Sequence, residues 1–506
     1  MGARRFALAT VLAVSVVAVG AAAGGILTVA QPVRVSGPSP FAGCTNIGPG
    51  TPGAVNYVNS EVEPWVAVNP VDPKNIIGVW QQDRWSDGGA RGLATGYTTN
   101  GGVTWNTTAA KFTFCSGGTA ANGGDFERAS DPWVTFSPNG AAYQISIAFN
   151  GLDLTNAVTV SRSPSGGATW SDPTTLIRDS GVRDSSWAFN DKESITADPF
   201  DSRYVYAVWD RLVSPNNKSR ASIQGLINSK TFRGPIWFSR TTNGGVSWEP
   251  ARMIADPGSH NQTIGNQIDV LADGTLMDLF TEIVAHKNAG GNRGVHFSVV
   301  RSSDHGASWG DSVVIADDTS KGVTDPETGQ PLRTGDGLPD IAVNRHPGTP
   351  GYGYAYVVWQ GTSSPSAPSD DTIYLSRSTD GGSTWSAPKS VNRTPNGAAA
   401  FLPSVQVAAD GTVGVTYYDL RNNTSAPSLP TDVWIVHSHD AGGTFGSESH
   451  VAGSFDFTTA PDAGGYFLGD YQGLDSVGNS FAPFFAETNS GDTTNRTDIF
   501  FTTASP

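Results

Sequence analysis

The chain has 506 residues, a formal net charge of -15, 60 glycines, 32 prolines and only 15% charged residues. Helical bundles and coiled coils depend on Glu, Lys, Ala and Leu and do not tolerate so much Gly and Pro, so both are excluded. The acidic surface repels phosphate backbones and excludes an ordinary nucleic-acid partner, which leaves a large all-β protein as the expected class.

The first thirty residues have the pattern of an export signal. Arg4 and Arg5 precede an apolar stretch from Phe6 to Ala30, which is the order of regions in a secretory signal. Small residues at 21–23 and at 28–30 offer two cleavage points. We expect a secreted, extracellular protein without a membrane contact after cleavage, and an uncleaved N-terminal anchor is the alternative. The predicted organisation is a signal over 1–30, a linker over 31–53 and one β domain over 54–506.

Cys44 and Cys115 are the two cysteines of the chain. Cysteine pairs in exported proteins are typically oxidised, so we expect a disulfide between them. This bridge would join the N-terminal segment to the first repeat of the domain. Two cysteines are too few for a zinc cluster.

An eight-residue pattern, here called the box, recurs six times, with its last aromatic residues 60 to 78 positions apart. It begins with Ser or Thr, has Asp, Asn or Ser at the third position and Gly at the fifth, and ends in Trp or Phe. These residues are typical of a hairpin turn followed by a buried ring. The six boxes cover residues 98–105, 163–170, 241–248, 302–309, 378–385 and 438–445.

Two apolar strands joined by a tight turn precede each box, and a seventh such unit follows the last box. A third strand separates them from the box, so each unit has room for four strands. The last unit ends after three strands, and we expect Ala54–Val58 to supply its fourth. Seven four-stranded sheets closed by the two chain ends form a β-propeller, with six blades plus an extra hairpin as the alternative.

The six boxes resemble the Asp-box, or bacterial neuraminidase, repeats of the sialidase superfamily, and the resemblance extends over about residues 55 to 505. It implies a β-propeller and a glycoside hydrolase of exo-α-sialidase type. Proteins with this repeat include other glycosidases and proteins without catalysis. The chain also departs from the family, because no Arg-Ile-Pro motif precedes the first box and the expected blade number is seven rather than six.

Strand direction predicts which rim of the propeller carries the site. In an antiparallel blade the boxes and the short turns after the first strands share one rim, while the long connections lie on the other. The opposite rim receives a ring of charged residues from the starts of first strands and the ends of second strands. Besides the candidates named below, this ring includes Glu61, Glu63, Asp131, Asp210, Asp336, Asp419 and Glu487.

Glycoside cleavage needs a carboxylic acid and a second nucleophilic or basic group. The ring supplies Asp83, Asp191 and Glu193 as catalytic candidates, and the resemblance implies Tyr471 as a nucleophile activated by Glu282. Arginines bind a carboxylate in a bidentate manner, which would suit an acidic sugar. The expected substrate-binding residues are Arg84, Arg128, Arg211, Arg421, Asp340 and Asp470.

The sequence predicts no cofactor, with calcium as a candidate ion at the acidic, Gly-rich stretches 123–127 and 336–340. The expected partner is a glycan bound by a monomer. Two other readings stay open: a non-catalytic propeller that binds glycan or protein at the same rim, and a lyase that acts on uronates.

Overall fold

The computed structural model describes residues 25–48, 50–153, 155–180, 188–213, 233–284, 294–363 and 371–506. Regular structure in this part of the chain is almost entirely β-strand, with short 3-10 turns η1 (Phe114–Ser116) and η3 (Phe457–Thr459). The predicted all-β class is confirmed. Residues 1–24 of the predicted export signal lie outside the described residues, and within the described ranges no helix is long and apolar enough to cross a membrane.

The described strands fall into consecutive antiparallel groups, and in the first six groups four strands pair in chain order. Group 1 contains β3 (Glu61–Val68), β4 (Ile76–Arg84), β5 (Ala90–Thr98) and β6 (Asn106–Thr108). Group 2 contains β7 (Arg128–Phe136), β8 (Ala142–Phe149), β9 (Asn156–Ser163) and β10 (Thr174–Asp179). Group 3 contains β11 (Ala188–Ala197), β12 (Val205–Val213), β13 (Ile236–Thr241) and β14 (Arg252–Ala255).

The next three groups repeat this order. Group 4 contains β15 (Asn261–Val270), β16 (Leu276–Val284), β17 (Gly294–Ser302) and β18 (Val313–Asp317). Group 5 contains β21 (Asp340–Val343), β22 (Ala355–Gly361), β23 (Thr372–Ser378) and β24 (Lys389–Ser390). Group 6 contains β25 (Ala400–Val407), β26 (Val413–Asp419), β27 (Pro430–Ser438) and β28 (Ser449–Asp456). A small additional sheet contains β19 (Val323–Thr324), β20 (Pro331–Arg333) and β29 (Tyr466–Phe467).

Group 7 combines both ends of the described chain. It contains β30 (Gly473–Val477), β31 (Ser480–Thr488) and β32 (Thr497–Phe501), and β2 (Val33–Arg34) pairs with β32. β1 (Thr28–Val29) pairs with β33 (Ala504–Ser505), and β33 in turn pairs with β31. The prediction that residues 54–58 supply the outer strand is therefore wrong: Asn56 instead bridges to Trp85 of group 1.

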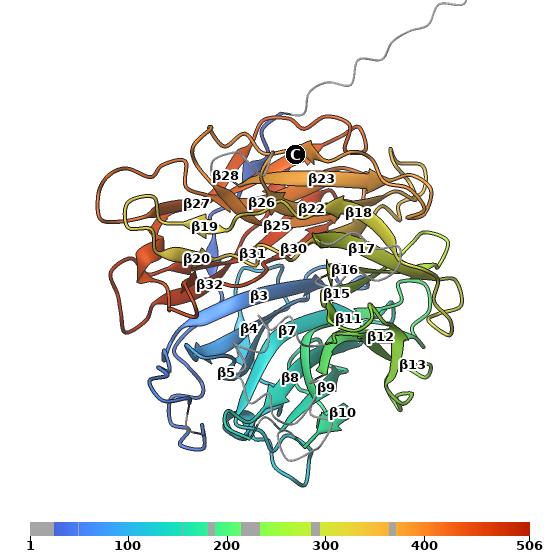
Figure 1. Cartoon of the computed structure of the whole chain (residues 1–506), viewed down its shortest axis with the longest axis vertical. Coiled ribbons are helices and arrows are strands. Elements are labelled where there is room, and N and C mark those ends of the chain that lie inside the picture. Colours follow the sequence, from blue (N-terminus) through green and yellow to red (C-terminus); the bar gives the residue numbers. More distant parts are fainter. Residues whose placement is uncertain are drawn as a thin grey trace, which may run out of the picture.

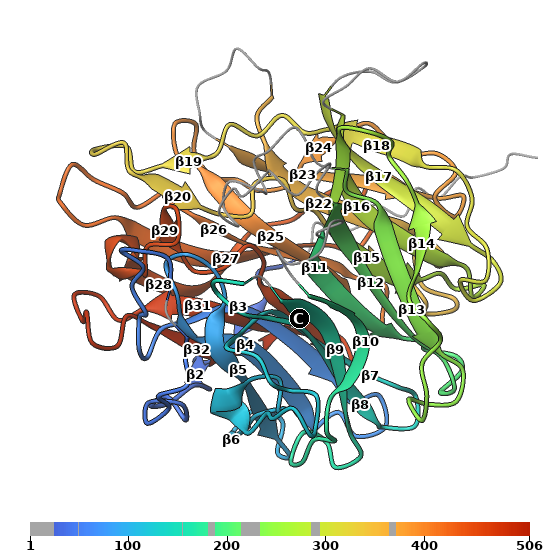
Figure 2. The same cartoon turned by 60° about the horizontal axis from the view of Figure 1, so that its bottom comes forward.

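The first strands of the groups contact one another in cyclic order. β3 contacts β7, β7 contacts β11, and the series continues through β15, β21 and β25 to β30, which contacts β3 again. Figure 1 views the molecule along the axis around which the strand groups are arranged. First strands such as β3, β7, β11 and β25 lie near the centre, and later strands such as β13 and β28 lie outside. The tilted view in Figure 2 shows the same order from β11 to β13.

Each box forms the same turn between the third and fourth strands of its group. In the fifth box, Gly382 N donates to Ser378 Oγ at 2.7 Å, and Thr384 N donates to Asp380 Oδ1 at 2.9 Å. The equivalent two bonds form in the other five boxes, including the second, where Ser165 Oγ replaces the carboxylate. The predicted turn chemistry is confirmed.

The boxes also join neighbouring groups. The closing Trp309 of the fourth box packs edge to face on Phe238 of group 3, with ring centroids 5.5 Å apart. Gly102 in the first box has φ of 90° and lies against Phe501 of group 7, where a β-carbon would clash. Gly is therefore required at this position both for backbone conformation and for close packing.

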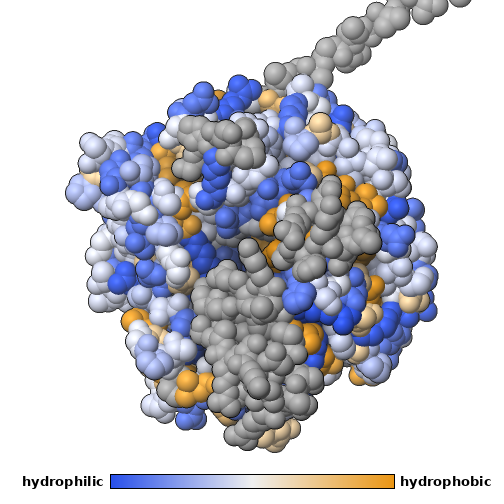
Figure 3. Space-filling model, in the orientation of Figure 1, coloured by the Kyte–Doolittle hydropathy of each residue, from blue (hydrophilic) through white to orange (hydrophobic). Residues whose placement is uncertain are grey.

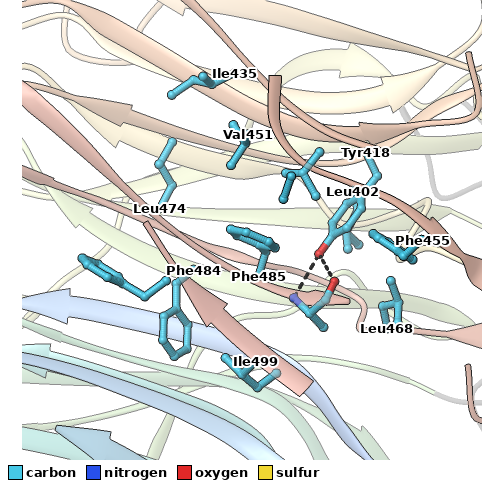
Figure 4. Close-up of a cluster of buried hydrophobic side chains, with 14 of the residues drawn as sticks. Leu402, Tyr418, Ile435, Val451, Phe455, Leu468, Leu474, Phe484, Phe485 and Ile499 are labelled. Carbon is cyan, nitrogen blue, oxygen red and sulfur yellow. Dashed lines mark hydrogen bonds between the residues drawn. The ribbon is translucent and has the colours of Figure 1, made fainter. Parts of the chain in front are cut away.

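The largest apolar core lies between groups 6 and 7 and includes Leu27 and Val35 from the N-terminal segment. Figure 4 shows part of this cluster, in which the Tyr418 hydroxyl donates to the carbonyl of Ala486 at 2.9 Å and accepts from its amide at 3.1 Å. Tyr418 thus buries its ring without leaving its hydroxyl unpaired. The predicted Cys44–Cys115 disulfide is present, with a Cα–Cα distance of 5.4 Å.

Candidate functional site

The inner ends of the first strands carry charged side chains on β-bulges. The pairing register shifts in β3, β7 and β11 around Glu63, Asp131 and Lys192, respectively. These three residues have φ values of 54°, 52° and 48°, which are uncommon for residues other than Gly. A bulge re-aims the side chain at its extra residue, so three consecutive groups direct a charged side chain toward the axis.

Lys192 is the centre of the resulting cluster. Its Nζ lies 3.3 Å from Glu63 Oε1, 2.9 Å from Asp131 Oδ1 and 2.8 Å from Asp470 Oδ2. Arg333 makes a second ion pair with Asp470, with Nε 2.9 Å from Oδ1. We call Glu63, Asp131, Asp191, Lys192, Arg333 and Asp470 the inner cluster.

The inner cluster forms the floor of a cavity of about 430 Å³. This volume lies within the usual range of small-molecule binding sites. Its other polar lining residues are Arg84, Asp87, Ser130, Thr281, Asp318 and Asp336, and apolar side chains such as Phe149, Phe189 and Leu338 complete its wall. Figure 3 shows both hydrophilic and hydrophobic residues bordering the hollow near the centre of this face.

The cavity opens at the rim opposite the boxes. Its lining comes from the starts of first strands and of β17, the ends of second strands and the connections that adjoin these strands, and none of its described lining residues belongs to a box. The boxes join the far ends of the third strands to the fourth strands. In an antiparallel group these two sets of connections lie at opposite edges.

The buried carboxyl groups of the cluster titrate differently. Burial raises the pKa of Glu63 to about 8 and, together with the charge of Asp131, that of Asp191 to about 7. Burial would also raise the pKa of Asp470, but Arg333 and Lys192 outweigh it and hold that pKa well below its ordinary value. The cavity therefore holds protonated and ionised carboxyl groups side by side at neutral pH.

Three of the residues predicted from the sequence line this cavity: Arg84, Asp191 and Asp470. Arg84 donates to Gln81 Oε1 at 3.0 Å and to the Gly89 carbonyl at 3.1 Å. Burial and the nearby Arg333 lower the pKa of Arg84 to about 10. Asp191 accepts a bond at 3.2 Å from the Lys192 amide.

The predicted pair of Tyr471 and Glu282 is not assembled. Thr281 and Ile283 line the cavity, so Glu282 between them on an extended strand points to the other face, where it pairs across the sheet with His296. The Tyr471 hydroxyl donates to the Pro132 carbonyl at 3.2 Å. Its ring lies below Lys192, whose Nζ is 5.4 Å from the ring centroid.

The remaining predicted carboxylates are buried behind the cavity wall. Asp83 accepts from Ser39 Oγ at 2.7 Å and from the Asn59 amide at 2.9 Å, which holds the N-terminal segment. Asp340 accepts from Ser404 Oγ at 2.7 Å. Glu193 accepts from the Ile147 amide, and burial, with the charge of Asp131, raises its pKa well above the usual value.

The other predicted arginines lie away from the cavity because each stacks on an indole ring. The guanidinium carbons are 4.3 Å from the ring centroid of Trp85 for Arg128, 4.9 Å from that of Trp237 for Arg211 and 3.8 Å from that of Trp434 for Arg421. Their carboxylate partners are Asp87, Asp179, Asp419 and Glu448. The expected arginine clamp for an acidic sugar is therefore not formed by these residues.

Sequence reasoning missed Lys192 and Arg333. Lys192 stands between Asp191 and Glu193, and the sequence pattern there indicated only the two acids as site residues. Arg333 comes from β20 in the long connection between groups 4 and 5, held by parallel pairing with Phe467 of β29. The length of this connection, on the expected rim, was the available signal.

No metal centre is formed by the residues that the structure describes, since none of their His, Cys, Asp and Glu side chains form a group of three suited to an ion. In the predicted calcium stretch 123–127, Asp125 forms a bidentate pair with Arg178, at 2.7 and 3.0 Å. Asp336 lines the cavity instead.

No family model and no curated protein matches the chain. Among solved structures, a Hadza microbial sialidase is 15% identical with a TM-score of 0.43, over 71% of this chain and 64% of the sialidase. The chain thus spans less than two thirds of that protein's length.

Two fungal structures have similar scores. The Penicillium chrysogenum α-L-arabinanase complexed with arabinobiose is 9% identical, with a TM-score of 0.45, over 94% of this chain and 98% of that one. The GH93 α-L-arabinofuranosidase of Fusarium graminearum with arabinobiose is 10% identical, with a TM-score of 0.46, over 77% and 92% of the two chains.

Proposed function

We propose that the protein is a glycoside hydrolase whose active site is the cavity above the inner cluster. The observation that carries this proposal is the pairing of Asp191, with a pKa raised to about 7, with the nearby carboxylate Asp131, which Lys192 holds at 2.9 Å. Glycosidases need two carboxyl groups of which one keeps its proton at the working pH.

Asp191 is the general acid in this proposal. It is 6% exposed, lines the cavity and has a protonated fraction near neutral pH because burial and Asp131 oppose its ionisation. It gives its proton to the glycosidic oxygen as the bond from that oxygen to the anomeric carbon breaks. A water molecule then supplies hydroxide to the anomeric carbon, and its proton returns to the carboxyl pair.

Asp131 is the second carboxylate, which stabilises the positive charge that develops on the sugar. Asp470 is less suited because it is ion-paired with both Lys192 and Arg333. Glu63 is less suited because its raised pKa, about 8, keeps it protonated at neutral pH. Lys192 positions both Asp131 and Asp470, and together with Arg333 it holds Asp470 ionised.

The charge of the lining favours a substrate without a carboxylate. Among the residues that the structure describes, seven acidic residues line the cavity against three basic ones, and both Lys192 and Arg333 are already paired with carboxylates. A sialic or uronic acid would face this excess of acids, whereas a neutral or amino sugar would not. We therefore propose a neutral or amine-bearing glycan in place of the acidic sugar expected from the arginines.

The seven strand groups are, in our proposal, the blades of one seven-bladed β-propeller, and the boxes are Asp boxes. The cyclic contacts of the first strands, from β3 to β30 and back to β3, support a closed ring. The shared turn bonds of the six boxes support the repeat assignment.

We also propose that the protein is secreted and that its signal is cleaved before Leu27. Leu27 is buried, its amide donates to Ser449 Oγ at 2.8 Å, and Thr28 and Val29 pair with β33. Cleavage at 28–30 would remove this strand, so the small residues at 21–23 are the better site. N-terminal sequencing of the exported protein tests this, and a mature chain starting after Ala30 contradicts it.

The proposed activity is tested with the purified protein on a panel of fluorogenic glycosides that includes neutral, amino, uronic and sialic sugars. We expect release of the aglycone from a neutral or amino sugar, and Asp191→Asn should lower kcat by about 10²- to 10⁴-fold. Asp304→Asn in the fourth box is the matched control and should retain activity, because Asn100 and Asn243 occupy the same box position. Binding to a glycan array without turnover of any substrate would favour the non-catalytic alternative.

A further inference from the structure

A second, smaller cavity of about 30 Å³ lies beneath the inner cluster. Asp131, Lys192 and Asp470 line both cavities, so this cluster forms the partition between them. Trp65, Trp133 and Tyr471 line the smaller cavity as well. Their rings pack against one another, with Tyr471 5.2 Å from Trp133 between centroids.

Three deeply buried side chains on the wall of this cavity carry polar atoms without a hydrogen-bond partner among the described protein groups. They are Oε2 of Glu193, both amide atoms of Asn266 and Oγ1 of Thr334. Glu193, Asn266 and Thr334 are each at most 2% exposed. Leaving a buried polar atom without a partner is unfavourable, so three such residues around one cavity indicate a polar occupant.

We propose that this cavity is an internal binding site for one or two water molecules, held by Glu193, Asn266 and Thr334. Its volume exceeds the roughly 10–15 Å³ that one water requires. Its free groups include the donor Nδ2 of Asn266 as well as acceptors, a mixture that water satisfies and a metal ion does not. The positive charge of Lys192, which lines the same cavity, also opposes a cation.

The bound water gives Glu193 a defined role. One oxygen of Glu193 accepts from the Ile147 amide, and the other has no hydrogen-bond donor among the residues that the structure describes. Water between this oxygen and the partition links Glu193 to the carboxylates around Lys192. Glu193 is then a positioning residue that acts from behind the cluster, and this assignment does not depend on which reaction the larger cavity performs.

A crystal structure of the full chain, at a resolution that defines ordered water, tests the site without any activity measurement. We expect density for one or two waters within hydrogen-bond distance of Glu193 and Asn266. A second crystal soaked in rubidium chloride distinguishes water from a cation through anomalous scattering. Rubidium in this cavity would overturn the proposal, and so would a cavity without density whose polar side chains bond to protein groups.

Two variants of Glu193 form a matched pair for the same measurement. Glu193→Gln keeps a polar group of nearly equal size and should retain the water, whereas Glu193→Leu should lose at least one water peak. Asn266→Leu, on the other wall, should have the same effect as Glu193→Leu and serves if that variant does not fold. Unchanged water peaks in Glu193→Leu and in Asn266→Leu would contradict the assignment of these side chains as the ligands.

Discussion

The inner cluster and the outer pairs, which we define as Arg211 with Asp179 and Arg421 with Asp419 and Glu448, use the same residue types at the same rim. They differ in where each side chain leaves its strand. The inner residues stand at bulges of first strands, on β20 or, for Asp470, in the connection before β30, and they line the central cavity. The outer arginines lie at the ends of second strands and stack over Trp237 and Trp434.

This difference shows that the radial position of a charge decides what it does in this fold. An arginine over an indole ring with carboxylate partners has its donors and its flat face occupied, so its role is structural. A lysine shared by three buried carboxylates cannot neutralise all of them. The inner cluster therefore retains carboxyl groups with raised pKa values next to an open cavity, which the outer pairs do not provide.

The most severe disruption of the inner cluster is Lys192→Met. It leaves Glu63, Asp131 and Asp470 buried together without their shared cation. Removing one partner of a buried ion pair costs about 3–5 kcal/mol, and the loss here should reach that range. Chemical denaturation measures this loss of stability. Activity, which is measured separately, should fall below detection.

Lys111→Met is the matched control for this variant. Lys111 pairs with Asp172 at 2.8 Å, but the two side chains are 44% and 60% exposed. Its removal should change the unfolding free energy by less than about 1 kcal/mol. Equal stability of the Lys192 and Lys111 variants would show that the inner cluster is no more than an ordinary surface network.

The arginines allow a direct comparison of the two regions. Arg333→Gln removes the second cation from Asp470, and kcat/KM should fall about 10²-fold. Arg421→Gln removes the partner of buried Asp419 and should lower stability by a few kcal/mol while kcat/KM stays within about twofold. Steady-state kinetics and denaturation on both variants provide the comparison. A larger loss of activity in the Arg421 variant would move the active site to the outer pairs.

The pH dependence of kcat/KM examines the inner cluster without a mutation. Asp191 must be protonated to act as the acid, and its pKa is raised to about 7. The rate should therefore fall above about pH 7, by tenfold per pH unit. A profile that stays flat to pH 9 would contradict the assignment of Asp191.

The smallest effect on activity is expected for substitutions in the boxes, at the rim opposite the cavity. Asp380 is exposed, and its bonds to Thr384 and Ser378 lower its pKa to about 2. Asp380→Asn should be nearly neutral, since Asn100 and Asn243 make the same turn, whereas Asp380→Ala should cost about 1 kcal/mol through the lost turn bonds. Thermal unfolding measures both, and activity should be unchanged in each variant.

The sequence predicted the all-β class, the box turns and the strand order because each has a local cause, and it predicted the disulfide because the chain has only two cysteines. Ser378, Asp380 and Gly382 form their turn from neighbours in the chain, and such patterns are read without long-range information. The prediction of the closing strand was wrong because its pairing is long-range. Val33 and Arg34 pair with β32 over more than 460 positions, and two residues give no recognisable strand pattern.

The candidate site was predicted only in part. The sequence placed Asp191, Asp470 and Arg84 at the correct rim, and they line the cavity. It could not show that Glu282 faces away from the axis, since this depends on the phase of strand alternation, nor that Lys192 unites three groups. The bulges at Glu63, Asp131 and Lys192 determine where these side chains point and which groups they contact. Amino-acid composition does not reveal such bulges.

A crystal structure of the Asp191→Asn variant soaked with the best substrate of the panel tests the central claim most directly. We expect the scissile bond to lie between residue 191 and Asp131, in the cavity above Lys192. A sugar bound instead in the separate cavity of about 220 Å³ that Arg345 and Asp475 line would contradict this assignment.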